Sequence, residues 1–322
     1  FLDGKYLCNI DGTQFFSSKK VNCEQCLTAT HANGETTCAH KVLQGVIIHP
    51  ELKPVIPLMP EQIVNSDGAS KQDCEINASK RWLSKVKQDH PELPLIINAD
   101  GVSSKQPFIT EVNQVGYNYI IVAKPDDHKY MMAWIDAFDS IPHKSFVDPK
   151  GKRHEYEWIE EIPLNGRPDS IQVNFFRYRI ISIDKKGKEK INFQCSWVTD
   201  LSVNADNIEV LVEGARKRWK IENECFNTLK NQGYCLEHNY GHGKANLCFN
   251  VYLFTLLAFY FHQIFELTDL TYQACRKKFG SKRHLWETMR TAIKWFVFES
   301  WDLLLNFMLT PTRYAPTITL SG

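Results

Sequence analysis

Three acidic residues adjoin hydrophobic segments of the chain, where a carboxylate needs a physical explanation. Asp11 and Asp100 lie in or just after the strand-like runs 5–16 and 95–97, and each is followed by glycine. Glu222 lies within a helical pattern of apolar residues. Because a carboxylate without a partner is costly to bury, each of these acids calls for a neighbouring cation or a metal ion.

The pattern around Glu222 predicts an amphipathic helix between residues 207 and 230. Its apolar stripe should face a core and comprises Ile208, Leu211, Val212, Ala215, Trp219, Phe226 and Leu229. Glu222 falls on this stripe, whereas Glu224 falls on the opposite, solvated face. Arg218 precedes Glu222 by one turn, so a surface ion pair between them, worth about 0.3–0.5 kcal/mol, is the alternative to a metal ion.

The three carboxylates together predict a magnesium centre. Mg²⁺ is a hard cation that prefers oxygen ligands and keeps several waters. Two such ions about 4 Å apart can activate an attacking oxygen and stabilise a leaving one in phosphodiester chemistry. Asp11, Asp100 and Glu222 would hold two Mg²⁺ or Mn²⁺ ions from three separate elements. Taken singly, each Asp-Gly pair is also what an ordinary turn contains.

With these residues in view, the chain resembles the DDE transposases of bacterial insertion sequences, in the group with a Tyr-x2-Arg-x3-Glu-x6-Lys signature. Arg218-x3-Glu222 matches the centre of that signature. The segments beginning at Asp11 and Asn98 resemble those that hold the family's two aspartates. This group carries a β-rich insertion before the glutamate, where the present chain has its longest gap between acids. Further matching segments are Lys71–Glu75, Asn231–Tyr234 and His238–Gly243.

Two positions depart from the signature. The signature tyrosine falls at Ala215, and the signature lysine falls at Leu229, one residue before Lys230. One residue rotates a side chain by about 100° around a helix. Lys230 could still reach DNA from the helix end, or it could be a solvated lysine.

The resemblance implies a set of DNA contacts beside the acids. Arg218 is the strongest, because its planar guanidinium suits a phosphate. Lys230, Trp219, His238 and His242 are the other expected DNA-binding residues. For His238 and His242 a local structural role is the alternative.

The resemblance also implies a fold and a reaction. The expected fold is α/β: an RNase H-like mixed sheet with flanking helices, interrupted by a mostly β insertion and followed by C-terminal helices. The expected enzyme is a transposase that cleaves transposon ends and transfers them to target DNA, as a homodimer on double-stranded DNA in the bacterial cytoplasm. The alternatives are an RNase H-like nuclease without strand transfer and a truncated, inactive DNA-binding remnant.

A cysteine–histidine cluster predicts a second metal site. Cys23-x2-Cys26 precedes a turn at Asn33-Gly34, and Cys38-x-His40 follows it, so a hairpin over residues 19–40 would bring the four groups together. They could form a structural Cys3His zinc site near Asp11, with His31 as a rival ligand. The alternative is a set of free thiols in an exposed hairpin.

The order of elements divides the chain into three parts. Residues 1–124 predict three strands, a helix at 72–88, a strand, a helix at 104–115 and a strand at 117–123, which together form a mixed sheet. Residues 125–206 predict the β-rich insertion, and residues 207–322 predict the catalytic helix and further helices of the core. The apolar run from Leu247 to Phe261 is shorter than a membrane span, so we expect a buried core helix.

Net charge and cysteine content limit the classes of protein to which this chain could belong. The chain has 322 residues and a net charge of +1, so it is not globally basic, and DNA contacts must come from local basic patches. Ten cysteines are too sparse for a disulfide scaffold in a chain of this length, which favours reduced cytosolic thiols. The first residues show no signal peptide. They also lack an initiator Met, so we expect the chain to be a fragment.

Overall fold

The computed structural model describes residues 1–66, 72–184, 187–242 and 246–313. Of the matching segments, Lys71 and Gly243 lie outside the described residues. The strands are β1 (Tyr6–Ser18), β2 (Leu27–Thr30), β3 (Thr36–Ile48), β4 (Ile56–Pro57), β5 (Glu61–Ile63), β6 (Leu95–Ala99), β7 (Asn118–Val122), β8 (His143–Val147), β9 (Arg153–Pro163), β10 (Gln172–Ile183) and β11 (Glu189–Thr199).

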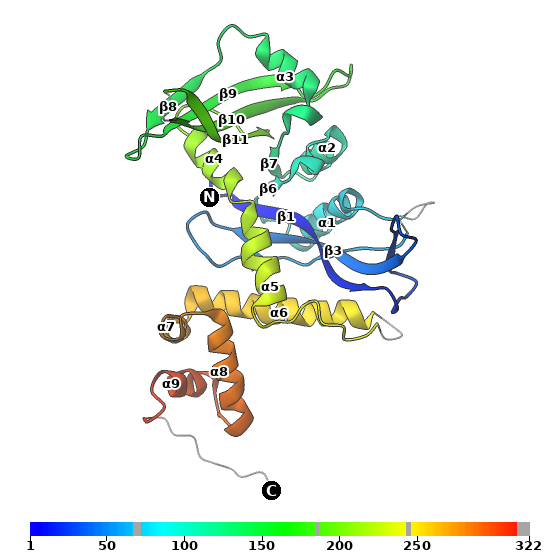
Figure 1. Ribbon diagram of the computed structural model, residues 1–322, viewed down its shortest axis with the longest axis vertical. Helices are drawn as coiled ribbons and strands as arrows, with labels where there is room; N and C mark the ends of the chain where they lie inside the picture. Colours follow the sequence, from blue (N-terminus) through cyan, green and yellow to red (C-terminus); the bar gives the residue numbers. More distant parts are fainter. Residues whose placement is uncertain (67–71, 185–186, 243–245, 314–322) are drawn as a thin grey trace.

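The helices of the described residues divide between the sheet and the C-terminal end (Figure 1). They are α1 (Glu75–Asp89), α2 (Gln106–Gln114), α3 (Lys129–Asp136), α4 (Ile208–Arg216), α5 (Asn227–Asn231), α6 (Leu247–Thr268), α7 (Leu270–Phe279), α8 (Lys282–Trp295) and α9 (Trp301–Leu309). Shorter helical turns are η1 (Gly101–Ser103), η2 (Pro125–Asp127) and the π-helical η3 (Ile221–Phe226).

One mixed sheet joins the described strands in the order β2-β3-β1-β6-β7-β11-β10-β9-β8. β1, β6 and β7 run parallel to one another, while β3 and β11 flank them in the antiparallel direction. β4 and β5 pair with the free edge of β3. The expected mixed α/β sheet with flanking helices is therefore confirmed.

Successive residues of the central strands point to opposite faces of the sheet and build two separate cores. Leu7, Ile96 and Ile120 belong to one core, which α4, η3, α5 and α6 cover. The next residue of each strand belongs to the other core, with α1, α2 and α3. Both faces are covered, which explains why β6 and β7 are continuous apolar runs rather than alternating ones.

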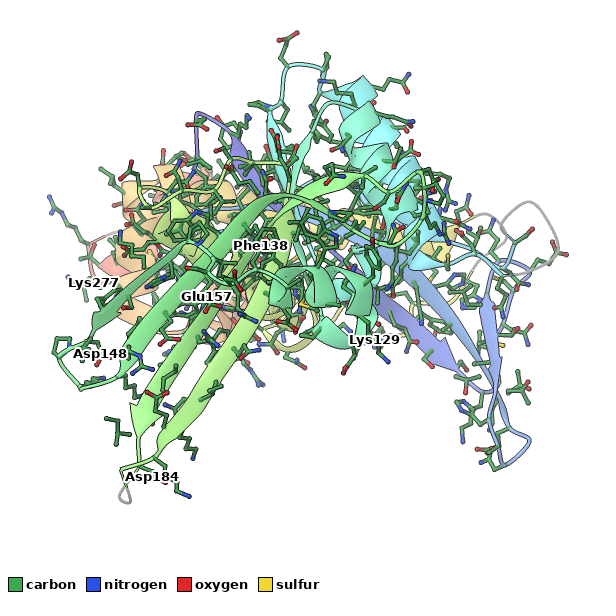
Figure 2. All side chains as sticks on the ribbon, turned by 90° about the horizontal axis from the view of Figure 1, so that it is seen from above. Lys129, Phe138, Asp148, Glu157, Asp184 and Lys277 are labelled. Atoms are coloured by element: carbon green, nitrogen blue, oxygen red, sulfur yellow. The ribbon has the colours of Figure 1, made fainter. Side chains whose placement is uncertain are left out.

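The region 125–206 is mostly β, as expected, and it continues the central sheet. β11 pairs with β7, with Trp197 opposite Val122, so strands β8 to β11 extend the sheet beyond its parallel part. Figure 2 shows the hairpin turns at Asp148 and Asp184 at the far end of these strands. The insertion thus stands beside α4, which leads toward Glu222.

Two predicted elements have different boundaries in the structure. The predicted strand at 42–49 is the second half of β3, because residues 38–48 pair with β1 along their whole length apart from one bulge. The predicted helix at 207–230 is broken: α4 ends at Arg216, and η3 and α5 follow after a short turn.

Helix α6 is only partly buried, which corrects the expectation of a core helix. One stripe packs inward through Tyr252, Leu256 and Phe259, while Phe254 is 73% exposed and Leu257 is 50% exposed. By length and composition alone, α6 would suit a membrane span, and it is the one helix of the described ranges that does.

Helices α7, α8 and α9 pack on one another beyond α6, at the end of the molecule opposite β8 (Figure 1). Their contacts form a separate small core that includes Tyr272, Leu285 and Leu305. We expected residues 207–322 to complete the main core, but only the part up to α6 packs against the sheet. The C-terminal helices therefore share a core of their own, which packs on α6 through Phe265.

Candidate active site

Strands β1 and β6 place two aspartates side by side. In this parallel pair Asn9 lies opposite Asn98, and the residues two positions further along each chain are Asp11 and Asp100. Since side chains alternate along a strand, each aspartate lies on the same face as the asparagine before it. Asp11 lies inside β1, so Asp11-Gly12 is not a turn. Asp100 follows β6 and caps η1, its Oδ1 accepting from the Val102 amide at 3.1 Å.

The two asparagines end helix α4 and fix its position over the sheet. Asn98 Nδ2 donates to Asn9 Oδ1 at 3.1 Å and to the carbonyls of Gly214 and Ala215 at 3.2 and 3.4 Å. Asn9 Nδ2 donates to the carbonyls of the next turn, at Lys217 and Arg218. Each of these four carbonyls also accepts a backbone N–H from the turn that follows, so the buried amides add a second donor at the end of the helix.

The break after α4 determines whether the residues that follow it point to the core or to solvent. Glu222 lies in η3, and its side chain is 50% exposed. Trp219 follows the turn, in the short helical stretch that leads into η3, and is 41% exposed. The expected stripe placed both toward the core, and this is wrong because a continuous α-helix does not form there. π-helical segments are rare in proteins, and those that occur are frequently found at functional sites.

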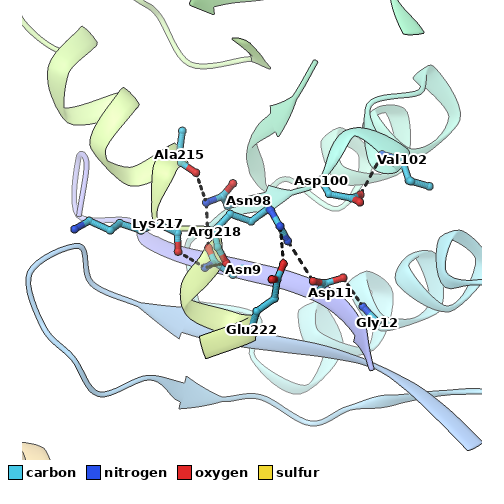
Figure 3. A network of polar contacts seen from close by, with 10 residues as sticks. All are labelled: Asn9, Asp11, Gly12, Asn98, Asp100, Val102, Ala215, Lys217, Arg218 and Glu222. Carbon is cyan, nitrogen blue, oxygen red and sulfur yellow. Dashed lines mark hydrogen bonds and ion pairs between the residues drawn. The ribbon is translucent and has the colours of Figure 1, made fainter. Parts of the chain in front are cut away.

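Arg218 lies between Asp11 and Glu222 (Figure 3). Its Nη1 is 3.2 Å from Asp11 Oδ2, and its Nη2 is 2.6 Å from Glu222 Oε1. The Arg218–Glu222 ion pair considered from the sequence is therefore present. The same guanidinium also contacts Asp11, so it joins an acid of the sheet to an acid of the helical segment. An ion pair confined to one helix face would not make this link.

The carboxyl group of Asp11 has an unusual pKa. Burial raises this pKa from 3.8 to about 6. The Arg218 guanidinium opposes the rise, whereas the negative charges of Asp100 and Glu222 add to it. The two other acids are therefore close enough to act on Asp11 through space. A set of carboxylates that repel one another is one that a divalent cation would stabilise.

The three carboxylates surround Arg218 without meeting at one point. Within the described ranges, no three acidic side chains bring their oxygens within 4.8 Å of one another. Asp11 is the central member, since both Asp100 and Glu222 influence its pKa. The arrangement suits separate cation positions on either side of Asp11 better than a single position shared by all three.

The expected DNA contacts differ in accessibility. Trp219 and His238 are exposed, and the His238 ring packs edge-on against Tyr240 with centroids 4.5 Å apart. Lys230 Nζ forms an ion pair with Glu237 at 2.9 Å. His242, which we expected beside DNA, instead turns its ring inward against Phe16 and His40.

The cysteine–histidine cluster forms, with one exchange of ligand. Donor atoms of Cys23, Cys26, His40 and His242 lie within 4.8 Å of one another. This group of the described residues does not include Cys38, which corrects the Cys3His set expected from the sequence. The rival ligand His31 lies on the exposed side of the hairpin, where its Nε2 bonds to Thr37 Oγ1 at 2.6 Å.

A pocket of about 560 Å³ adjoins the acids, and sequence reasoning missed it. It lies between α4 and strands β9 to β11 of the insertion. Arg218 and Trp219 line one side, and the ring of Tyr178 lines the other. The guanidinium of Arg216 stacks on Tyr178 and Phe193, with its central carbon 5.2 and 4.8 Å from the ring centroids. Cationic, aromatic and acidic groups, the last being Glu209 and Glu213, thus line this pocket, and it meets the acid cluster through Arg218.

The two asparagines were also missed, although the sequence holds a signal for them. Asn9-Ile10-Asp11 and Asn98-Ala99-Asp100 repeat the spacing Asn-x-Asp in two strands. That spacing places an amide and a carboxylate on one face of each strand. No protein-family model matches this sequence, and no curated protein matches it.

Proposed function

We propose that the chain is a DNA transposase that cleaves transposon ends and joins them to target DNA with the help of two Mg²⁺ or Mn²⁺ ions. The convergence of Asp11, Asp100 and Glu222 around the Arg218 guanidinium carries this proposal. Three acids from two strands and a helical segment gather on one face of the sheet, although they are far apart in the sequence.

We include an RNase H-like core in the proposal. The support is the order β3-β1-β6-β7, with β3 antiparallel to β1 and the three other strands parallel. The first acid lies on β1, the second follows β6, and the third lies on a helical segment that packs across β1 and β3. The family resemblance implies the same placement of the three acids.

The residues present fit divalent cations. Asp11, Asp100 and Glu222 offer hard oxygen donors, and the Arg218 guanidinium lies between two of them as a cation already in place. Asp11 would be the shared ligand, flanked by Asp100 and Glu222. Bound Mg²⁺ would supply activation of the attacking oxygen and stabilisation of the leaving oxygen.

The chain's own groups would position the DNA. Arg218 would turn from the carboxylates to a phosphate once cations neutralise the acids, since its planar fork suits a phosphate. Trp219 offers an exposed ring beside the pocket for stacking on a base. In cleavage, water would attack the phosphorus and release a 3′-hydroxyl, and in joining that hydroxyl would attack a target phosphodiester. Two copies of the chain would hold the two DNA ends.

Cleavage of the natural DNA tests the proposal. The substrate is a supercoiled plasmid that carries the genomic segments flanking the coding sequence on both sides. We expect Mg²⁺-dependent strand breaks at fixed positions, lost in Asp11→Asn, Asp100→Asn and Glu222→Gln. Glu224→Gln is the matched control, because Glu224 lies in the same helical segment outside the acid cluster. Cleavage that survives all three catalytic substitutions would disprove the assignment.

The alternative, an RNase H-like nuclease, differs in its second step. A duplex with a preformed 3′-hydroxyl at the cleaved end bypasses hydrolysis. A transposase joins this end to a target plasmid, whereas a nuclease degrades the duplex or leaves it unchanged. The appearance of joined product therefore separates the two functions.

A further inference from the structure

Four metal-binding side chains converge at the end of the sheet that carries the hairpin. The Sγ atoms of Cys23 and Cys26 are 3.7 Å apart, and Nε2 of His40 is 3.4 and 3.5 Å from them. A ring nitrogen of His242 completes a group with all donors within 4.8 Å. Tetrahedral zinc, with bonds of about 2.3 Å to sulfur and 2.0–2.1 Å to nitrogen, requires donor separations of about 3.4–3.8 Å.

The imidazole of His242 is an independent observation that points to a ligand. Both of its ring nitrogens are buried, and neither has a hydrogen-bond partner among the residues that the structure describes. The ring is held edge-on between Phe16 and His40, with centroids 4.4 and 4.8 Å away. Buried polar atoms normally have partners, so a nitrogen directed into a cluster of thiols requires an explanation.

The turn that carries the two cysteines is also arranged for a bound metal. The backbone N–H of Cys23 donates to Cys26 Sγ at 3.4 Å, and the N–H of Cys26 donates to the Cys23 carbonyl at 3.1 Å. An N–H directed at sulfur favours the thiolate, which is the form that binds metals. The two sulfur atoms are too far apart for a disulfide, whose S–S bond is about 2.05 Å.

We propose that Cys23, Cys26, His40 and His242 form a structural zinc site. Two thiolates and two imidazoles with donors within 4.8 Å of one another match Zn²⁺ and disfavour Mg²⁺, which takes oxygen ligands. Cys38, expected from the sequence as the fourth ligand, is replaced by a histidine that lies more than 200 residues further along the chain. This site is independent of the DNA chemistry proposed above.

The site joins two distant parts of the fold. Cys23, Cys26 and His40 belong to the hairpin of β2 and β3, whereas His242 belongs to the segment between α5 and α6. The described part of that segment, residues 232–242, contains no helix or strand, and it carries the exposed residues His238 and Tyr240. Zinc would fasten this segment to the sheet, just after the helical region that holds Glu222.

The zinc content of the purified 322-residue chain tests the proposal. We expect stoichiometric zinc after dialysis against a weak chelator, and binding weakened more than about tenfold in His242→Ala and Cys23→Ser. Cys38→Ser is the matched control, because it removes a neighbouring thiol and should retain zinc. Removal of zinc should also speed chymotryptic cleavage at Tyr240. Zinc retained in His242→Ala but lost in Cys38→Ser would overturn the site.

X-ray absorption at the zinc edge identifies the ligands in the natural chain. The result therefore does not depend on whether a variant folds. Two sulfur and two nitrogen neighbours support the site. Three sulfur neighbours, or a reconstituted protein that takes up no zinc, would refute it. Substitution with Co²⁺ gives a second spectroscopic record of tetrahedral sulfur and nitrogen ligation.

Discussion

Arg218 and Asp11 lie 207 positions apart in the sequence, yet Nη1 of the arginine is 3.2 Å from Oδ2 of the aspartate. The same guanidinium pairs with Glu222, so one positive charge joins two of the three acids. In the absence of a divalent cation, this arginine partly neutralises the site. Under the proposed function, metal ions would therefore compete with Arg218 for the same carboxylates.

Substitution of Arg218 should separate metal binding from catalysis. We expect Arg218→Gln to bind Mn²⁺ about tenfold more tightly at pH 8 without DNA, because a competing positive charge is gone. DNA cleavage should fall by about 100-fold, because the phosphate contact is lost. Calorimetric titration with Mn²⁺ and the plasmid assay measure the two effects. Weaker Mn²⁺ binding in the variant would show that Arg218 does not compete with the metal.

Asn98 should position the site through helix α4. Asn98→Leu leaves Asn9 Oδ1 without its donor and removes one of the two donors from each of two helix carbonyls, so we expect a loss of about 1–3 kcal/mol in the free energy of unfolding. Cleavage should fall further than unfolding explains, because Arg218 and Glu222 follow the displaced helix.

Thr199→Val is the matched control for Asn98→Leu. The Thr199 hydroxyl donates to the Tyr119 carbonyl at 2.6 Å, and the residue is fully buried in β11. We expect a loss of about 1–2 kcal/mol in the free energy of unfolding with normal cleavage at a temperature where both variants are folded. Equal cleavage by the two variants would remove the positioning role of Asn98.

The raised pKa of Asp11 should make the metal-free protein less stable as pH rises. The pKa is 3.8 in the unfolded chain and about 6 in the folded one, so the folded state holds more protons between pH 4 and 6. The free energy of unfolding therefore falls through that window, by at most about 3 kcal/mol.

Asp11→Asn should remove this pH dependence. With EDTA present, we expect the variant to be about 1–3 kcal/mol more stable than the natural chain at pH 8 and equally stable at pH 4. Mg²⁺ should stabilise only the natural chain, because it binds the ionised site. Urea unfolding across the pH range measures both effects, and a variant less stable than the natural chain at pH 8 would contradict them.

Trp219→Ala should affect DNA binding and leave stability unchanged. The ring is 41% exposed, so the free energy of unfolding should change by less than about 0.5 kcal/mol. Affinity for the flanking genomic DNA should fall about 5–20-fold, since stacking on a base contributes about 1–3 kcal/mol. A core tryptophan would instead cost about 3–5 kcal/mol when truncated, and urea unfolding distinguishes the two.

Local patterns predicted the elements of the sheet well. The segments around Asp11 and Asp100 are strand-like because their apolar residues continue over the length of a strand, and this information is present in each segment. The helix around Glu222 was predicted to be continuous, because Trp219 and Phe226 keep the helical spacing. Its break depends on the amides of Asn9 and Asn98, which are distant in sequence, and periodicity within one segment cannot show such partners.

The cysteine–histidine cluster shows the same limit. Cys23, Cys26 and His40 lie within one hairpin, so their spacing indicated a shared site. His242 approaches from a segment beyond η3 and α5, and the packing of that segment on β1 selects it over Cys38. Contacts within a hairpin follow from spacing, whereas contacts between distant segments follow from the packing of the whole fold.

Binding of Mn²⁺ to the full chain, followed by electron paramagnetic resonance at pH 8, tests the metal centre most directly, because it needs no knowledge of the DNA sequence. One equivalent of zinc is supplied beforehand to the cysteine–histidine site and unbound zinc is removed, because Zn²⁺ in excess would displace Mn²⁺ from the carboxylates. We expect Mn²⁺ binding to the natural chain and to Glu224→Gln, and its loss in Asp11→Asn. Equal Mn²⁺ binding by the natural chain and Asp11→Asn would contradict the proposal that this aspartate is the shared ligand of the centre.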